Sequence, residues 1–454
     1  MTELLTLVSV VISLACLVLW ISQPRLLALL LWPVVFLYPR AMLQGILPLN
    51  AGLDDLFIVA LGLRLLFYVH PDDPAPPRWF NGAVWVAIAL SVMQVASEAT
   101  GLLEYPMFSQ YTIRTALKCV GYVLFVHCLT RTIRTEQDLR RHLVSLMLTL
   151  FLAFLTVVAC NFYPDLADIW QVYRSSADQR AFAEFSQEAM RSWGSLGSPF
   201  AIGMVLCVAI PVGIGLLIHR HRSTALYAAT LLMLAGAALA IIIAKSRSAV
   251  LGLAVMGGGM VVASRYRIRV LAAVCVLAII WIGASASVGY DRLEKRFNTD
   301  TLRRDLDVRL GIWRTFVENP SPAIIAYGEG TYAMWARLGE TAHNGFIDAL
   351  FVWGIGGALT FAIVIWKQFS WSRRVVRYDD SPLARAIAWG ALWSILAAAG
   401  AGMTGDPWFA PQYRYLAYFL IVVTWSRSQM VQSTVPMTTM SDSAQRFGNM
   451  QPSY

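Results

Sequence analysis

The 454-residue chain is 57% hydrophobic and only 14% charged, with a mean hydropathy of +0.58. Soluble domains carry about 25% charged residues, so this composition excludes an ordinary soluble protein and indicates a polytopic membrane protein embedded in membrane lipid. The net charge of +9 does not call for a nucleic-acid partner, because membrane proteins carry surplus Lys and Arg in their cytoplasmic loops. All the cysteines lie in apolar segments, and we expect them to fill the core.

Apolar segments long enough for transmembrane helices occur along most of the chain. A helix needs about 20 apolar residues to cross the hydrocarbon core. We therefore predict an all-α integral membrane protein with 12 or 13 transmembrane helices. The candidate spans are 4–21, 26–38, 53–69, 84–95, 113–129, 143–160, 199–218, 225–244, 249–262, 270–288, 345–366, 384–402 and 415–424.

The spans divide the chain into six parts. The first segment lacks a basic leader and a small-residue cleavage pattern, so we do not expect a cleavable signal peptide. The end of the chain is rich in Ser, Thr, Met and Gln without apolar periodicity, and we expect it to be disordered. The six parts into which the spans divide the chain are N-terminal helices at 1–160, a long loop at 161–198, central helices at 199–289, a second long loop at 290–343, C-terminal helices at 344–426 and a tail at 427–454.

Basic residues predict the orientation. Four clusters occur between spans: residues 131–141, 219–222, 265–269 and 373–377. Counting spans places all four on one side, which the positive-inside rule makes cytoplasmic, together with the tail. The two long loops then face the outer side, and long loops in compact proteins are usually functional.

The second long loop contains an amphipathic stretch at 303–316. Its apolar residues Leu306, Leu310, Trp313 and Phe316 recur at helical spacing. Arg309 lies among them. We expect a helix that lies on the membrane surface and directs Arg309 inward.

Several basic residues are expected at the outer side, where basic residues are normally sparse. Arginine clusters suit a diphosphate, because the planar guanidinium makes paired hydrogen bonds to phosphate oxygens. Alternatives remain: Arg114 and Lys118 could extend to lipid headgroups, and Arg314 could be solvated. Asp305 and Asp307 have the spacing of a metal-binding pair, but neighbouring arginines favour salt bridges. The candidates are Arg114, Lys118, Arg191, Lys245, Arg247, Arg309 and Arg314.

His343 and Asn344 end the second loop, where a hydrophobic helix begins. We expect Asp348 one turn further into that span. A neutral histidine can accept a proton from a sugar hydroxyl, and arginines can stabilise a departing diphosphate. A histidine that merely faces the headgroups is the alternative. These parts suit transfer of a glycan from a polyprenyl diphosphate to a hydroxyl.

The order of these motifs resembles the bacterial O-antigen ligase and O-antigen polymerase superfamily, over roughly Arg191 to Gly357. The matching elements are His343-Asn344-x-Phe346-Ile347-x-x-Leu350 with Gly354 and Gly357, Arg309-x-x-x-Trp313 before Pro320 and Gly328-Glu329-Gly330, Ser246-Arg247-Ser248, and Gly197-Ser198-Pro199-Phe200. Phe200 replaces the usual Asn, and Val352 stands where many members have an acid. Asp348 is the candidate replacement for that acid.

The resemblance implies a GT-C-like, inverting glycosyltransferase that needs no metal or cofactor. Its donor would be an undecaprenyl-diphosphate-linked glycan, used at the periplasmic face of the inner membrane beside other polysaccharide assembly proteins. It assigns acceptor activation to His343 and the diphosphate to Arg247 and Arg309.

Three functions remain open. Two arginine-bearing outer loops suit two anionic lipid-linked substrates, which favours a polymerase of exopolysaccharide or O-antigen repeat units. The first alternative is a ligase that transfers glycan to lipid A core or another acceptor. The second is a flippase or other transporter, which predicts internal repeats and broken helices at the membrane midplane. The sequence shows no such repeat.

Overall fold

The computed structural model describes residues 22–38, 53–67, 81–163, 166, 194–196, 199–219, 223–244, 246–263, 267–268, 271–272, 275, 299–318, 322–338, 344–403 and 411–434. Within these ranges every regular element is a helix, which confirms the all-α prediction. Seven of the described helices are long and apolar enough to cross a membrane, and two further apolar helices are shorter. The protein is therefore a polytopic, membrane-embedded helical protein.

Eleven of the expected spans coincide with described helices. The span at 4–21, and most of the span at 270–288, lie outside the described residues, so the total of 12 or 13 stays a prediction. The helices are α2 (Pro24–Leu27), η1 (Ala28–Leu30), α3 (Leu31–Leu37), α4 (Leu53–Phe67), α5 (Gly82–Glu104), η4 (Pro106–Phe108), α6 (Ser109–Thr132), α7 (Glu136–Phe162), η6 (Gly194–Leu196), α9 (Pro199–Ile218), α10 (Thr224–Ala244), α11 (Arg247–Ala263), α14 (Thr299–Glu318), α15 (Pro322–Tyr327), α16 (Thr331–Leu338), α17 (Gly345–Tyr378), α18 (Pro382–Gly402) and α19 (Pro411–Thr434).

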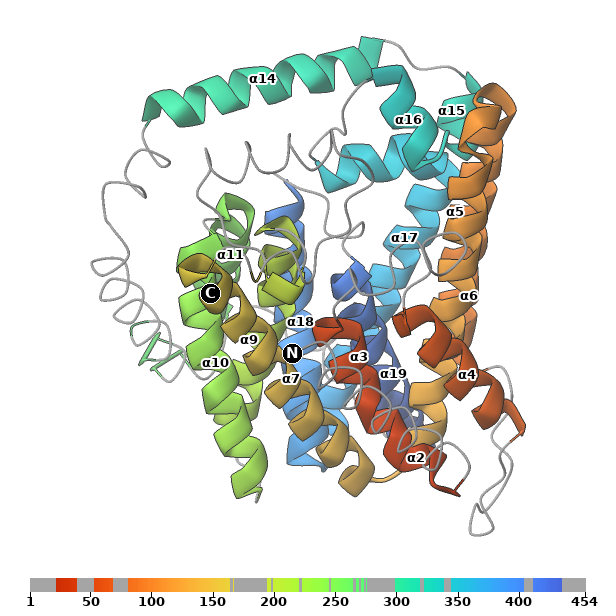
Figure 1. Ribbon diagram of the computed structural model, residues 1–454. Helices are drawn as coiled ribbons and strands as arrows, with labels where there is room; N and C mark the ends of the chain where they lie inside the picture. Colours follow the sequence, from red (N-terminus) through yellow and green to blue (C-terminus); the bar gives the residue numbers. More distant parts are fainter. Residues whose placement is uncertain are drawn as a thin grey trace, which may run out of the picture.

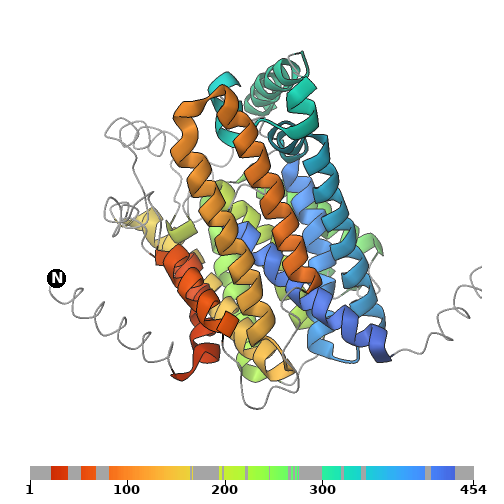
Figure 2. The ribbon, with the colours of Figure 1, turned by 90° about the vertical axis from the view of Figure 1, so that its right-hand side faces the viewer.

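The bundle is built around α9, which is buried along nearly its whole length. It packs against α18, α10, α11 and α19, and α7 covers α10. On the other side, α5 and α6 run beside each other, with α4 against α6 (Figure 2). Buried aromatic rings join the two sides: Trp32 makes edge contacts with Phe125 and Phe419.

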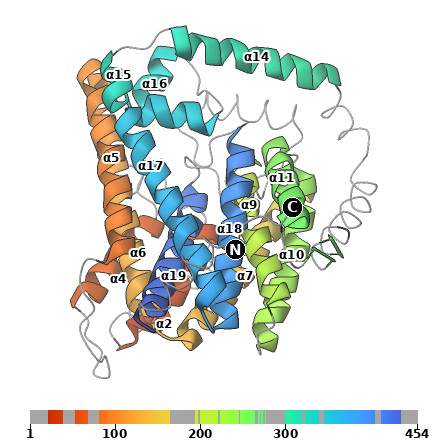
Figure 3. The same cartoon turned by 180° about the vertical axis from the view of Figure 1, so that it is seen from behind.

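One end of the bundle is covered by the helices of the second long loop. Helix α14 lies across this end, and α15 and α16 lie between it and α5 and α17 (Figures 1 and 3). The amphipathic helix predicted at 303–316 is therefore present, within α14. The connection between α6 and α7 and the last turns of α17 lie at the opposite end (Figure 1). Two of the four basic clusters, at 131–141 and 373–377, therefore lie at the end opposite α14.

Helix α17 is broken at Gly354, where φ is 65° and ψ is −176°. The part before the break lies across the bundle end beneath α14, and the part after it descends along the bundle (Figure 1). The prediction of one continuous span at 345–366 was therefore wrong. Asp348 belongs to the transverse part, because the backbone turns at Gly354 before entering the bundle.

Two further boundaries differ from the predictions. Arg140 and Arg373 lie in α7 and α17 and not in loops, because both helices continue past their apolar segments. Helix α19 runs to Thr434, so the disordered tail does not begin at residue 427. Arg427 lies in this helix and contacts both carboxylate oxygens of Asp379, at 2.7 and 2.9 Å, which ties the extended end to the bundle.

Candidate functional site

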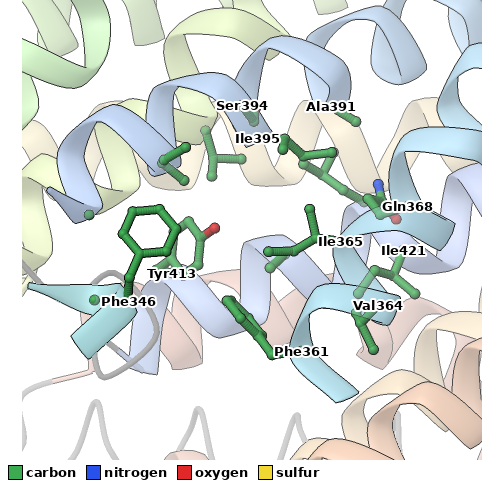
Figure 4. A pocket seen from close by; sticks show the side chains of 17 residues that line it. Phe346, Phe361, Val364, Ile365, Gln368, Ala391, Ser394, Ile395, Tyr413 and Ile421 are labelled. Carbon is green, nitrogen blue, oxygen red and sulfur yellow. The ribbon is translucent and has the colours of Figure 1, made fainter. Parts of the chain in front are cut away.

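An apolar cavity of about 220 Å³ lies between α17, α18 and α19. Its walls come from the descending part of α17 and from the facing sides of α18 and α19 (Figure 4). The α18 wall extends from Ala391 to Gly402, which at about 1.5 Å per helical residue is roughly 16 Å. The cavity therefore extends from the covered end of the bundle well into the apolar interior.

The two ends of the cavity differ in chemistry. Phe346 and Tyr413 lie towards one end, whereas Gln368 lies at the other beside Val364 and Ile421 (Figure 4). Gln368 accepts a hydrogen bond from the Thr424 hydroxyl at 3.2 Å. Its amide nitrogen has no acceptor among the residues that the structure describes. The apolar part of the cavity therefore stops at this amide, since an apolar occupant cannot satisfy it.

Asn344 fixes the start of α17 at the end of the cavity nearest α14. Its side-chain oxygen accepts hydrogen bonds from the backbone N–H groups of Phe346 and Ile347, at 3.0 and 3.2 Å. Its side-chain nitrogen donates to the Met403 carbonyl at 3.4 Å, just beyond α18. Asn344 thus caps one helix and joins it to the end of another. Four residues later, Asp348 is fully buried.

The broken helix is held by a turn of the second long loop. The backbone N–H groups of Glu329 and Gly330 donate to the Phe351 and Val352 carbonyls, both at 3.1 Å, next to the break at Gly354. On its other side the turn meets α5 at Gly101, where a side chain would collide with the Glu329 carbonyl. The turn therefore lies between α5 and α17 and contacts both helices.

Two buried carboxylates also hold the turn in the joint between α5, α16 and α17. Glu329 is 2% exposed and binds Arg337 of α16 in a paired contact, at 2.6 and 2.9 Å. Glu98 of α5 is 3% exposed and accepts a hydrogen bond from the Thr331 backbone N–H at 3.0 Å, at the first residue of α16. A carboxylate at a helix N-terminus satisfies an otherwise unpaired donor and the helix dipole.

The two candidate arginines on α14, Arg309 and Arg314, differ in their burial. Trp313 packs against the buried core. Arg309 lies one turn before it and is half-buried, in agreement with the predicted inward direction. Leu306 and Leu310 of the predicted apolar face are instead about half exposed, at 51% and 48%. Arg314 is exposed and pairs with Glu318 on the same helix at 2.5 Å. Of the two, Arg309 is the one on the side that faces the bundle.

Lys118 and Arg114 lie on α6, which packs against α5 and α4. Lys118 forms ion pairs with Asp54 and Asp55 of α4, at 3.4 and 2.5 Å. Its charge is therefore compensated within the bundle, which favours a structural role for Lys118. Arg114, one turn away, is half-buried and has no ion pair among the described residues.

Other predicted site residues lie outside what the structure describes. His343, Lys245 and Arg191 fall outside the described residues. Arg247 is the first residue of α11, but its side chain is not described. In the sequence His343 directly precedes Asn344, and Gly345, the next residue, lines the cavity.

Sequence reasoning missed a buried polar cluster between α5, α6 and α19. Arg414 donates to the Gln94 side-chain oxygen at 2.6 Å and lies over the Tyr122 ring at 5.3 Å. Arg414 and Glu98 are both buried, at 5% and 3% exposure. Ionisable residues inside a membrane segment are functional candidates by default, and Glu98 within an apolar stretch was a visible signal.

Comparison with known proteins adds no family to this description. No protein-family model matches the chain. No curated protein matches it significantly.

Proposed function

We propose that the protein is a membrane glycosyltransferase that moves a glycan from a polyprenyl diphosphate to a sugar hydroxyl. The observation that carries this proposal is the apolar cavity between α17, α18 and α19, whose outer end is formed by Gly345 and Phe346. A lipid carrier needs an apolar channel for its chain that ends beside polar groups for its diphosphate. The cavity and the start of α17 offer this combination.

The residues around the outer end have separate roles in this proposal. His343 accepts the proton from the acceptor hydroxyl as that oxygen attacks the anomeric carbon. Arg309 and Arg247 bind the diphosphate and stabilise its charge as the glycosidic bond to phosphate breaks. No metal takes part, so activity should survive chelation. Support for the role of His343 comes from its neighbour in the sequence, Asn344, which caps the transverse part of α17 and joins it to the end of α18.

Polymerisation of carrier-linked repeat units is the form of the reaction that we favour. The motif order resembles the O-antigen ligase and polymerase superfamily, and arginines in two outer loops suit two anionic carrier-linked substrates. The end covered by α14 would face the periplasm of a bacterial inner membrane, because the basic clusters mark the opposite end as cytoplasmic. A ligase that uses lipid A core as acceptor is the alternative within the same chemistry.

A lipid-linked glycan transporter is the second candidate function. It is supported by the break in α17 at Gly354, since transporters use broken helices around their substrates. The two candidates differ in one measurable property. The transferase forms a new glycosidic bond in detergent solution, whereas the transporter only moves its substrate across a bilayer.

Paired tryptophan substitutions on α17 test the cavity. Ile365 lines the cavity, whereas Ile363 on the same helix is 58% exposed at the surface of the bundle. Ile365→Trp should reduce the efficiency of transfer from a long-chain carrier by about tenfold, because displacing two buried methylene groups costs about 0.8 kcal/mol each.

Transfer from a short-chain prenyl diphosphate donor should change little in Ile365→Trp, since such a donor does not reach this depth. Ile363→Trp should behave like the wild type with both donors. Equal losses for the two variants, or no loss for Ile365→Trp with the long-chain donor, would remove the cavity from the proposal.

A further inference from the structure

A second cavity, of about 550 Å³, lies at the end of the bundle opposite α14. It is formed where the first turn of α2 meets the end of α6 and the first turns of α7. Arg25 of α2 and Arg141 of α7 both line it. Two guanidinium groups from separate helices thus contribute to one cavity.

The acidic residue of this cavity is already engaged. The Asp138 carboxylate accepts hydrogen bonds from the Thr135 backbone N–H at 3.1 Å and from the Thr135 hydroxyl at 2.9 Å, which forms the capping box of α7. Arg141 is exposed and makes no ion pair within the part of the chain that the structure describes. The described residues that line the cavity thus include two guanidinium groups and one carboxylate.

His142 also lines the cavity. It is 2% exposed, and its Nδ1 accepts a hydrogen bond from the Trp32 indole N–H at 3.3 Å. An imidazole that accepts at Nδ1 is neutral there and carries its proton on Nε2, which makes Nε2 a donor. The imidazole therefore adds no negative charge to the cavity.

Leu26 and Leu29 line the same cavity, and Leu26 is 42% exposed. A free phosphate gains nothing from leucine side chains, whereas a lipid places its acyl chains against them. Basic cavities between transmembrane helices at the cytoplasmic side bind anionic lipid headgroups. We propose that this cavity binds the phosphate headgroup of an anionic phospholipid in the leaflet opposite α14, with Arg25 and Arg141 on the phosphate.

Lipid binding by the full-length protein tests the proposal without any transfer assay. Delipidated protein in detergent is titrated with phosphatidylglycerol, with phosphatidylcholine, and with inorganic phosphate alone, by native mass spectrometry and thermal unfolding. Phosphatidylglycerol should bind and stabilise the wild type. The double variant R25Q/R141Q should lose about tenfold or more in affinity, because both charge-assisted contacts disappear.

The matched control is R140Q/R373Q, which removes the same charge from the same end of the bundle. Neither residue lines the cavity. Arg373 is exposed, and Arg140 forms only an i,i+4 surface pair with Glu136 at 3.5 Å, so phosphatidylglycerol affinity should stay within about twofold of the wild type, because such surface charges contribute little. Equal losses of affinity in both double variants would show that surface charge, and not the cavity, attracts the lipid, and would overturn the proposed site.

Wild-type affinity in R25Q/R141Q, or wild-type binding of phosphatidylcholine equal to that of phosphatidylglycerol, would overturn the proposal as well. Stabilisation by inorganic phosphate equal to that by the lipid would make this a site for soluble phosphate and contradict the lipid. If the double variant fails to fold, Arg141→Gln alone decides the question, because Arg141 is exposed and its loss should not disturb the fold.

Discussion

The second long loop consists of two parts that the bundle holds in different ways. The Gly328–Gly330 turn and α16 are fixed by two main-chain hydrogen bonds to α17, a buried ion pair and a carboxylate cap. Helix α14 instead exposes Leu306, Val308 and Leu310 and carries a surface ion pair. The turn therefore fixes the transverse part of α17, whereas α14 contacts the core through a smaller part of its surface, which includes Ile312 and Trp313.

Breaking the buried ion pair should have the largest effect on stability. Arg337→Leu leaves the Glu329 carboxylate in a site where it is 2% exposed. Loss of one partner of a buried pair costs about 3–5 kcal/mol. We expect a marked fall in the thermal unfolding temperature in detergent and loss of protease protection around α16.

The double variant Arg337→Leu/Glu329→Leu is the control for that loss. It should recover much of the stability, because no unpaired charge remains buried. If Arg337→Leu alone is as stable as the wild type, the pair does not hold the turn in place.

Substitution of the glycine at the break in α17 should have the second largest effect on stability. Gly354 has a backbone conformation that only glycine adopts readily, and a Cβ there would lie 2.5 Å from the Gly328 nitrogen. Gly354→Ala should destabilise the protein by about 1–3 kcal/mol from backbone strain alone, and by more once the contact is included.

Gly356→Ala provides the matched control two residues away. A Cβ at Gly356 meets its nearest atom at 3.9 Å, so this variant should unfold like the wild type. Comparable thermal unfolding of the two variants would show that the bend does not depend on Gly354.

The smallest effect on stability should come from α14. The Arg314–Glu318 pair is exposed, with side chains 78% and 55% accessible. Arg314→Ala should change stability by at most about 0.5 kcal/mol. A loss of transfer activity in this variant with unchanged unfolding would assign Arg314 to substrate binding, whereas unchanged activity would make it a solvated surface residue.

The helices could be predicted from the sequence because hydropathy and amphipathic spacing are local properties. The same reasoning placed α14 and the inward face of Arg309. The break in α17 could not be predicted, because the run Gly354-Ile355-Gly356-Gly357 permits a bend without requiring one. The contact with the distant turn at Glu329 selects it, and this moved Asp348 from a descending span into the transverse part.

The joint between α5, α16 and α17 was also not predicted. Glu98 and Glu329 lie far apart in the sequence, and only the fold brings them to neighbouring parts of one turn. The pairing of Lys118 with Asp54 and Asp55 is of the same kind. Charge compensation between helices depends on packing, which hydropathy and spacing do not contain.

Glycan transfer by the purified full-length protein tests the central claim most directly. The donor is an undecaprenyl-diphosphate-linked oligosaccharide, and the acceptor is either a second carrier-linked oligosaccharide or lipid A core. We expect a lengthened glycan with release of undecaprenyl diphosphate, preserved in EDTA and abolished in His343→Ala while that variant unfolds like the wild type. Absence of transfer to both acceptors, or transfer by His343→Ala at the wild-type rate, would contradict the proposed function.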